Sequence, residues 1–183
     1  MSGRIFLICE DENDTKVVQC LIDVLGFSVK VIARTLSSAT PGISRLAAEL
    51  ISLVATARKE IRDEDCIAVL HDNDQKQPDR SLYDSIYEQC KREKVNLIVA
   101  TDNIESWLLS DSGISKWLNI TRKTWNSDTH SKTELIRLMN DRYKLKYSRY
   151  LEKVLDHAKA DSTNQSFIDA LKKLQNAPCV KGS

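Results

Sequence analysis

The chain has 183 residues, of which 42% are hydrophobic and 29% are charged, proportions that are ordinary for a globular domain and exclude a low-complexity or fibrous chain. Its formal net charge of +1 neither indicates nor excludes a nucleic-acid partner, because a local basic patch can exist within a neutral total. No segment reaches the roughly 18 apolar residues of a membrane span and no secretory leader is evident, so we expect a cytoplasmic protein without membrane contact.

The cysteines carry a second indication of the compartment. There are five (Cys9, Cys20, Cys66, Cys90 and Cys179), an odd number without a Cys-x-x-Cys pair. Three of them lie in or beside apolar runs, where cysteine behaves as a small buried hydrophobic residue. This usage predicts a reducing compartment and argues against a disulfide framework or a zinc cluster.

Short apolar or β-branched runs alternate with amphipathic segments through residue 100. We expect strands at residues 4–9 ("RIFLIC"), 27–33 ("FSVKVIA"), 66–70 ("CIAVL") and 95–100 ("VNLIVA"). Between them we expect helices from Asp14 or Thr15 to Gly26, over about 43–61, and over 82–93. The alternation predicts right-handed βαβ crossovers, and hence an α/β fold with a four-stranded, mainly parallel sheet and flanking helices.

The pattern changes after residue 105, where no further strand is indicated. Helical spacing recurs near residues 104–109, 115–118, 131–145, 150–158 and 166–174. We therefore predict an α/β domain over residues 1–112, followed by a helical C-terminal extension over residues 113–183 that packs on it.

Carboxylates follow three of the four predicted strands: Glu10, Asp11 and Glu12 the first, Asp72 and Asp74 the third, and Asp102 and Glu105 the fourth. Each alone is an ordinary turn or cap residue. The carboxyl ends of parallel strands meet at one edge, however, and carboxylates gathered there repel one another unless a cation neutralises them. Oxygen ligands favour Mg²⁺ or Mn²⁺ over zinc. The neighbouring His71 is better explained as a strand-end residue than as a ligand.

These residues resemble the Toprim module, a metal-binding α/β domain of topoisomerases, bacterial primases and OLD-family nucleases. "FLICE" supplies Glu10 as the glutamate after the first strand, and "LHDND" supplies the Asp-x-Asp pair Asp72 and Asp74. Asp14 matches the further acid of the OLD-type variant, while Asp11 stands where the family has glycine. "DNIESWLLSD" and the helical tail resemble small stand-alone Toprim-related proteins, some of them from bacterial defence loci.

The resemblance implies a metal-dependent nuclease that hydrolyses phosphodiester bonds of DNA or RNA, with Mg²⁺ or Mn²⁺ as cofactor and a defence system as a possible setting. Glu10, Asp72 and Asp74 would be the catalytic residues, with Glu10 sharing the metal or acting as general base. Asp14 and Glu105 would complete the metal ligands at a second position.

The segment "RYKLKYSRYLEK" alternates basic residues with tyrosines. Basic side chains contact phosphates and tyrosines stack on unpaired bases, so we expect nucleic-acid contacts from Lys132, Arg142, Lys144, Lys146 and Arg149. Equally open is an arrangement in which the tyrosines pack against the sheet and the cations form a solvated helix face. Trp107 has helical spacing with Ile104 and Leu108, which predicts a core residue and leaves Glu105 facing the acidic edge.

Other functions remain open at this point. A non-catalytic Toprim-like binding module could dock on a partner ATPase or a nucleic-acid complex. A receiver-like signalling domain begins with a similar strand, acidic cluster and helix. In this chain, however, the second acidic site comes at residue 72, later in the sequence than in a receiver. An immunity factor that binds another protein is neither favoured nor disfavoured by the sequence, which also leaves DNA against RNA and the oligomeric state undecided.

Overall fold

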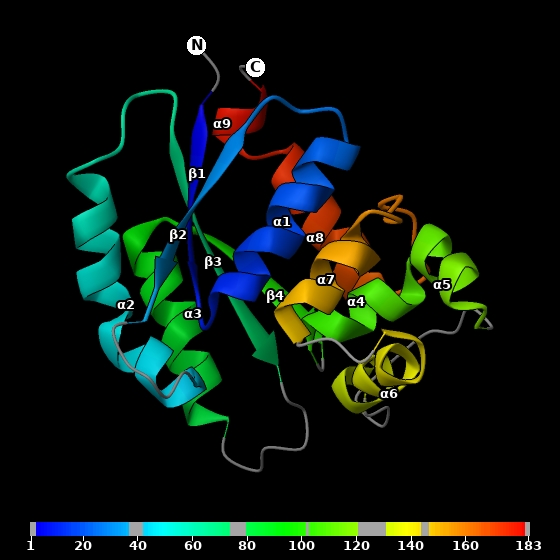
Figure 1. Ribbon diagram of the computed structural model, residues 1–183. Coiled ribbons are helices and arrows are strands. Elements are labelled where there is room, and N and C mark those ends of the chain that lie inside the picture. The colour runs from blue at the N-terminus through cyan, green and yellow to red at the C-terminus, as the bar shows by residue number, and fades with distance from the viewer. Residues whose placement is uncertain are drawn as a thin grey trace.

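The computed structural model describes residues 3–36, 42–73, 80–101, 103–120, 131–143 and 147–181, without the side chains of Thr35, Ser148, Lys181 and residues 139–143. Four strands form one sheet in the order β2-β1-β3-β4, and all three strand pairs are parallel. Figure 1 shows the sheet with helices on both sides. The predicted α/β fold with flanking helices and a helical C-terminal part is confirmed.

The elements follow the predicted order, with small differences at their ends. The strands are β1 (Arg4–Cys9), β2 (Lys30–Thr35), β3 (Cys66–Asn73) and β4 (Asn96–Thr101). The helices in the described part are α1 (Glu12–Val24), α2 (Ile43–Arg58), α3 (Ser81–Glu93), α4 (Ile104–Ser110), α5 (Ser112–Leu118), α6 (Ser131–Tyr143), α7 (Tyr147–Leu155), α8 (Gln165–Gln175) and α9 (Pro178–Lys181). Only α9 has no counterpart among the predicted helices.

The sheet separates two hydrophobic clusters, because successive side chains of a strand point to opposite faces. Phe6 and Ile8 of β1 pack against α2 and α3, whereas Ile5 and Leu7 join the cluster on the other face. That second face is covered by α1 together with α7 and α8, as Figure 1 shows. Residues from both sides of the predicted boundary at 112/113 therefore share one core. The C-terminal helices form part of the helical layer on the same face of the sheet as α1.

Helix α1 begins earlier than predicted. Its N-cap is Asp11 rather than Asp14 or Thr15, and Asp11 and Asp14 form a capping box in which each carboxylate accepts from a backbone N–H at the other end of the first turn. Asp11 has φ −139° and ψ 167°, ordinary extended backbone. Asp11, at the position where the Toprim module has glycine, is therefore unstrained, and Glu10 lies directly before a well-formed helix start.

Strand β3 runs farther than predicted, through His71 and Asp72 to Asn73, and pairs with β4 to its end. Asp72 thus belongs to the ladder, opposite Ala100 and one residue before its last rung, rather than to the loop. His71 is 3% exposed, its Nδ1 lies 2.9 Å from the carbonyl oxygen of Asp72, and its ring packs beside Tyr83. These contacts agree with the interpretation of His71 as a strand residue.

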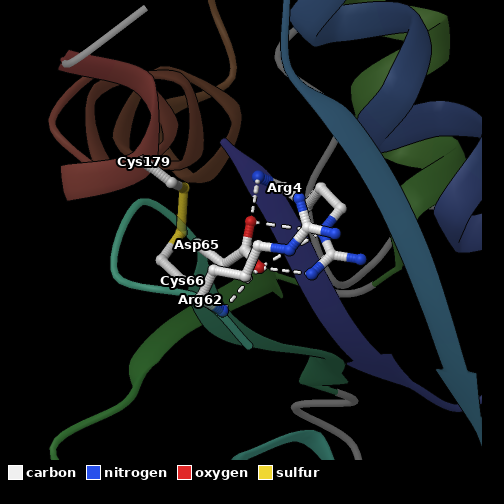
Figure 2. The surroundings of a disulfide bond; sticks show 5 residues. All are labelled: Arg4, Arg62, Asp65, Cys66 and Cys179. Carbon is white, nitrogen blue, oxygen red and sulfur yellow. Dashed lines mark hydrogen bonds and ion pairs between the residues drawn. A yellow bond between two sulfur atoms is a disulfide. The ribbon is translucent and has the colours of Figure 1, made fainter. Parts of the chain in front are cut away.

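A disulfide joins Cys66, the first residue of β3, to Cys179 in α9, with the two Cα atoms 5.5 Å apart (Figure 2). The expectation that the cysteines form no disulfide is wrong for this pair. The fold brings together two residues 113 positions apart, and their spacing gave no sign of it. Beside the bond, the Asp65 carboxylate accepts from the backbone N–H of Arg4 at 2.8 Å and from its guanidinium at 2.6 Å, and this partner lowers the pKa of Asp65 to about 2.

A buried carboxylate connects α5 to the segment that follows α7. Asp111, 1% exposed, accepts hydrogen bonds from the backbone N–H groups of Gly113 and Ile114 in α5 and of Lys159 and Asp161. Gly113 permits this close approach, since a Cβ there would lie 2.0 Å from the carbonyl oxygen of His157. The segment after α7 is thereby fixed on the start of α5.

Reduction of the disulfide should destabilise the protein by about 2–4 kcal/mol, because a cross-link that closes a long loop restricts the unfolded chain. We expect a lower melting temperature for wild type in dithiothreitol and no effect of the reductant on the Cys66→Ala/Cys179→Ala variant. Alkylation of the unreduced, denatured chain should label only Cys9, Cys20 and Cys90. Five labels before reduction would contradict the bond.

Asp111→Ala should lower the free energy of unfolding by about 2–4 kcal/mol, because several buried backbone donors lose their acceptor. Chemical denaturation measures this change. Asp169→Ala is the matched control, since Asp169 is an exposed acid of α8 whose carboxylate accepts a hydrogen bond from the Gln165 side chain. Equal losses for the two variants would show that the Asp111 contacts do not stabilise the fold.

Candidate metal centre at the carboxyl edge of the sheet

A cavity of about 220 Å³ lies where β1 and β3 end, and its walls come from both halves of the chain. The described residues that line it are Glu10, Asp11, Asn13, Asp14, Val17, Asp72, Ile104, Glu105, Lys132, Tyr147 and Leu151. Five of these are carboxylates and one is a cation. We refer to this cavity as the acidic cavity.

Each carboxylate is brought to the cavity by a defined element. Glu10 follows β1 directly, and Asp14 lies in the first turn of α1, where its carboxylate accepts from the backbone N–H of Asp11. Asp72 lies in β3, one residue before the end of the strand, and its Oδ1 accepts a hydrogen bond of 3.0 Å from the backbone N–H of Ile104. That bond fixes the start of α4, so the next residue, Glu105, also faces the cavity.

Helices α6 and α7 add a cation and a hydroxyl group. Glu105 is only 3% exposed, and its Oε1 accepts a hydrogen bond of 2.5 Å from the Tyr147 hydroxyl group. The Lys132 ammonium lies 3.6 Å from the same oxygen and 5.5 Å from the centroid of the Tyr147 ring. More than half of the Lys132 side chain is exposed. Lys132 thus contacts Glu105 from the solvent-exposed side of the cavity, whereas Tyr147 contacts it from a half-buried position.

Burial and mutual repulsion perturb the ionisation of the cluster. Burial is the largest cause that raises the pKa of Glu10, and the charge of the neighbouring Asp11 adds to it. The same two causes raise the pKa of Asp14 to about 8. Burial and the charge of Asp14 raise the pKa of Asp72 well above its usual value. Burial acts to lower the pKa of Lys132, but the surrounding carboxylates, Glu105 first, raise it overall. Ionisation of these buried carboxyl groups is therefore unfavourable by itself, and a cation bound among them would stabilise their charged forms.

The donor atoms fit Mg²⁺ or Mn²⁺ in kind, since hard cations prefer carboxylate oxygens. Within the described ranges, however, no group of three or more His, Cys, Asp or Glu side chains has its donor atoms close enough together to hold a metal ion in the present conformation. Asp74 and Asp102, which the sequence adds to this edge, lie outside the described residues. The acidic cavity brings candidate ligands together, and coordination by those described would require their side chains to rotate.

The other predicted residues have mixed outcomes. Lys144 and Lys146 lie outside the described residues, as does the side chain of Arg142, while Arg149 is exposed on α7 and does not line the acidic cavity. For the tyrosines, the packing alternative is correct at Tyr150, which is 1% exposed in the core. Trp107 is fully buried, as predicted, and its indole N–H donates to Ser166.

The sequence did not identify Tyr147 as part of this site. It lies 42 residues from Glu105, and the helical pattern of α7 gives no sign that this hydroxyl group reaches a carboxylate rather than a base or the core. The structure also gives Asp11 a place in the cavity wall besides its capping role. Both contacts depend on the packing of distant elements.

No protein-family model, no curated protein and no solved structure matches this chain. The resemblance to the Toprim module therefore stays a prediction that depends on the short motifs and their order. In the described part of the chain, no helix is both long and apolar enough to cross a bilayer.

Asp14→Asn should change how stability depends on pH. The pKa of Asp14 is about 8 in the folded chain against an ordinary 3.8, so the folded state binds the proton more tightly. The stability that Asp14 contributes is complete below pH 4 and is lost as pH rises to about 8. Melting temperatures in EDTA should therefore fall more steeply between pH 5 and 8 (roughly the window set by these values) for wild type than for Asp14→Asn.

The matched control for this comparison is Asp84→Asn, because Asp84 is an exposed acid in the first turn of α3 that does not line the acidic cavity. It should follow the wild-type profile. Parallel profiles for wild type and Asp14→Asn would contradict a strongly perturbed Asp14 carboxyl group.

Proposed function

We propose that the chain is a divalent-cation-dependent nuclease that hydrolyses phosphodiester bonds with Mg²⁺ or Mn²⁺ as cofactor. The observation that carries the proposal is the acidic cavity itself. Glu10 directly after β1, Asp14 in α1, Asp72 in β3 and Glu105 in α4 line one cavity at the carboxyl edge of a parallel sheet. This is the edge where ligands of such sheets bind, and the order of the acids is the one that resembles the Toprim module.

The positions of the acids support distinct roles. Glu10 and Asp72, with Asp74 from the following loop, are the proposed ligands of a first cation, and Asp14 and Glu105 those of a second. When bound, such ions supply positive charge that neutralises a phosphodiester in its transition state. As the alternative to this ligand role, Glu10 is the proposed general base, since its half-buried carboxylate lies in the wall of the cavity.

Two of the predicted basic residues, Lys132 and Arg149, support binding of a polyanion. Lys132 stands on the wall of the acidic cavity with most of its side chain exposed, so a phosphate that approaches the carboxylates would meet its ammonium group. Arg149 offers a second exposed cation on α7. We propose DNA or RNA as the substrate, with Lys144, Lys146 and Arg142 as further contacts, and a bacterial defence system as the setting.

A second function is favoured by a different observation. No three acidic side chains of the described chain are placed to hold a metal ion as they stand, and Lys132 and Tyr147 already contact Glu105. The same cluster would suit a non-catalytic Toprim-like binding module, in which these contacts stabilise the fold and the protein docks on a partner ATPase or a nucleic-acid complex. Response to divalent cations separates the two functions.

Asp72→Asn should abolish the response to metal while preserving the fold, because the amide oxygen can still accept from Ile104. Wild type should melt several degrees higher in Mn²⁺ than in EDTA, since a ligand that binds only the folded state stabilises it. Asp72→Asn should show no such rise. Cleavage of labelled single-stranded and duplex DNA and RNA should fall by about a hundredfold or more in the variant.

Asp84→Asn, which removes an exposed carboxylate remote from the cavity, should behave as wild type in both assays. Cleavage that persists in Asp72→Asn would come from a contaminant and would remove the support for the nuclease. A wild-type protein that neither cleaves nor responds to Mn²⁺ would instead favour the binding module.

A further inference from the structure

A second cavity, of about 460 Å³, lies on the helical half of the molecule, outside the acidic cavity. The described residues that line it are Gly113, Lys116, Trp117, Asp156, His157, Ala158 and Lys159. They come from α5 and from the segment that follows α7. The volume falls within the range of about 300–1,000 Å³ that is usual for sites that bind small molecules or single nucleotides.

The wall of this cavity contains a pair of stacked aromatic rings. The Trp117 and His157 rings are nearly parallel, 18° between their planes, with centroids 4.4 Å apart. The chain has another stacked pair, Trp107 with Phe167, but both of those rings are buried in the core. In contrast, Trp117 is half-buried and His157 is exposed. Trp117 packs against the core with part of its side chain, and the Trp117–His157 pair contributes aromatic area to the wall of the cavity.

The stack is held in place by the backbone. The Asp111 carboxylate accepts from Lys159 N–H at 3.1 Å, and Ser112 N–H donates to the carbonyl oxygen of Asp161 at 2.7 Å. Because Gly113 has no side chain, the carbonyl oxygen of His157 can lie directly against α5. The relative positions of His157 and Trp117 are thus fixed before any ligand binds, which reduces the entropy lost on binding.

The charges around the stack favour an anion with a planar ring. Lys116 and Lys159 are exposed cations that line the cavity, and Asp156 is the one acid among its described residues. Single-stranded nucleic acids are bound by this combination, in which bases extend an aromatic stack and lysines contact the adjacent phosphates. A duplex keeps its bases paired and stacked inside, so it cannot use the aromatic rings in this way.

We propose that this cavity binds one base of a single-stranded nucleic acid, which stacks on the Trp117–His157 pair while Lys116 and Lys159 contact its flanking phosphates. The proposal rests on the nuclease function to the extent that it names single strands as the substrate. Binding itself requires no divalent cation and is separable from cleavage.

The test is fluorescence anisotropy in EDTA with labelled single-stranded oligonucleotides and a matched duplex, using wild type, His157→Ala, Lys159→Gln and Tyr87→Ala. His157→Ala should weaken single-strand binding by about five- to a hundredfold, the usual effect of losing one base stack, and should leave duplex binding unchanged. Lys159→Gln should lower the salt dependence of binding by about one phosphate contact. Tyr87→Ala removes an exposed aromatic ring of α3 and should bind as wild type.

Absence of single-strand binding by wild type would overturn the proposal, and so would equal losses of single-strand and duplex binding in His157→Ala or no loss at all. Cleavage assays on the same proteins distinguish this result from failure of the nuclease function. If His157→Ala loses single-strand binding but wild type cleaves nothing, the base site stands and the nuclease does not. If wild type cleaves in an Asp72-dependent manner while His157→Ala binds normally, only the base site is refuted.

Discussion

Repulsion between carboxylates at one edge of the sheet is the constraint on which the rest of the site depends. The parallel pairing of β1 with β3 brings Glu10 and Asp72 to the same edge, and the hydrogen bond from Ile104 to Asp72 adds Glu105. Such a cluster opposes folding unless its charge is compensated. In the described chain, α6 and α7 meet part of that requirement by placing Lys132 and Tyr147 against Glu105. The helical half of the molecule thus belongs to the site electrostatically as well as to the core.

One short segment illustrates how structure and site are combined. In "IESWLLSD", Glu105 faces the acidic cavity, whereas Trp107 on the other side of α4 is fully buried and bonds Ser166 of α8. Asp111 ends the segment, caps α5 and holds the residues after α7. This short segment therefore positions a candidate ligand, anchors α8 and orders the second cavity. In this segment Glu105 is a candidate functional residue, whereas Trp107 and Asp111 have structural roles.

Local signals in the sequence were sufficient for the strands, the helices and the place of most acids. The continuous apolar run of β1 predicted its burial, and Glu10, Asp72 and Glu105 were expected at one edge because parallel strands end together. Features that depend on distant packing were not predictable. The Cys66–Cys179 bond and the contact of Tyr147 with Glu105 join residues 113 and 42 positions apart. The start of α1 was misplaced because Asp11, Asn13, Asp14 and Thr15 are all of residue types that commonly cap helices.

The disulfide between Cys66 and Cys179 has a mechanical consequence. It closes a covalent ring that contains β3, β4 and every helix from α3 to α8, and leaves β1, α1, β2 and α2 outside it. Tension applied between the first and last residues would bypass the ring and load the segments before Cys66. Strand β1, which lies between β2 and β3 in the sheet, would have to be sheared from both neighbours, while the chain from Cys66 to Cys179 could not be stretched to its contour length.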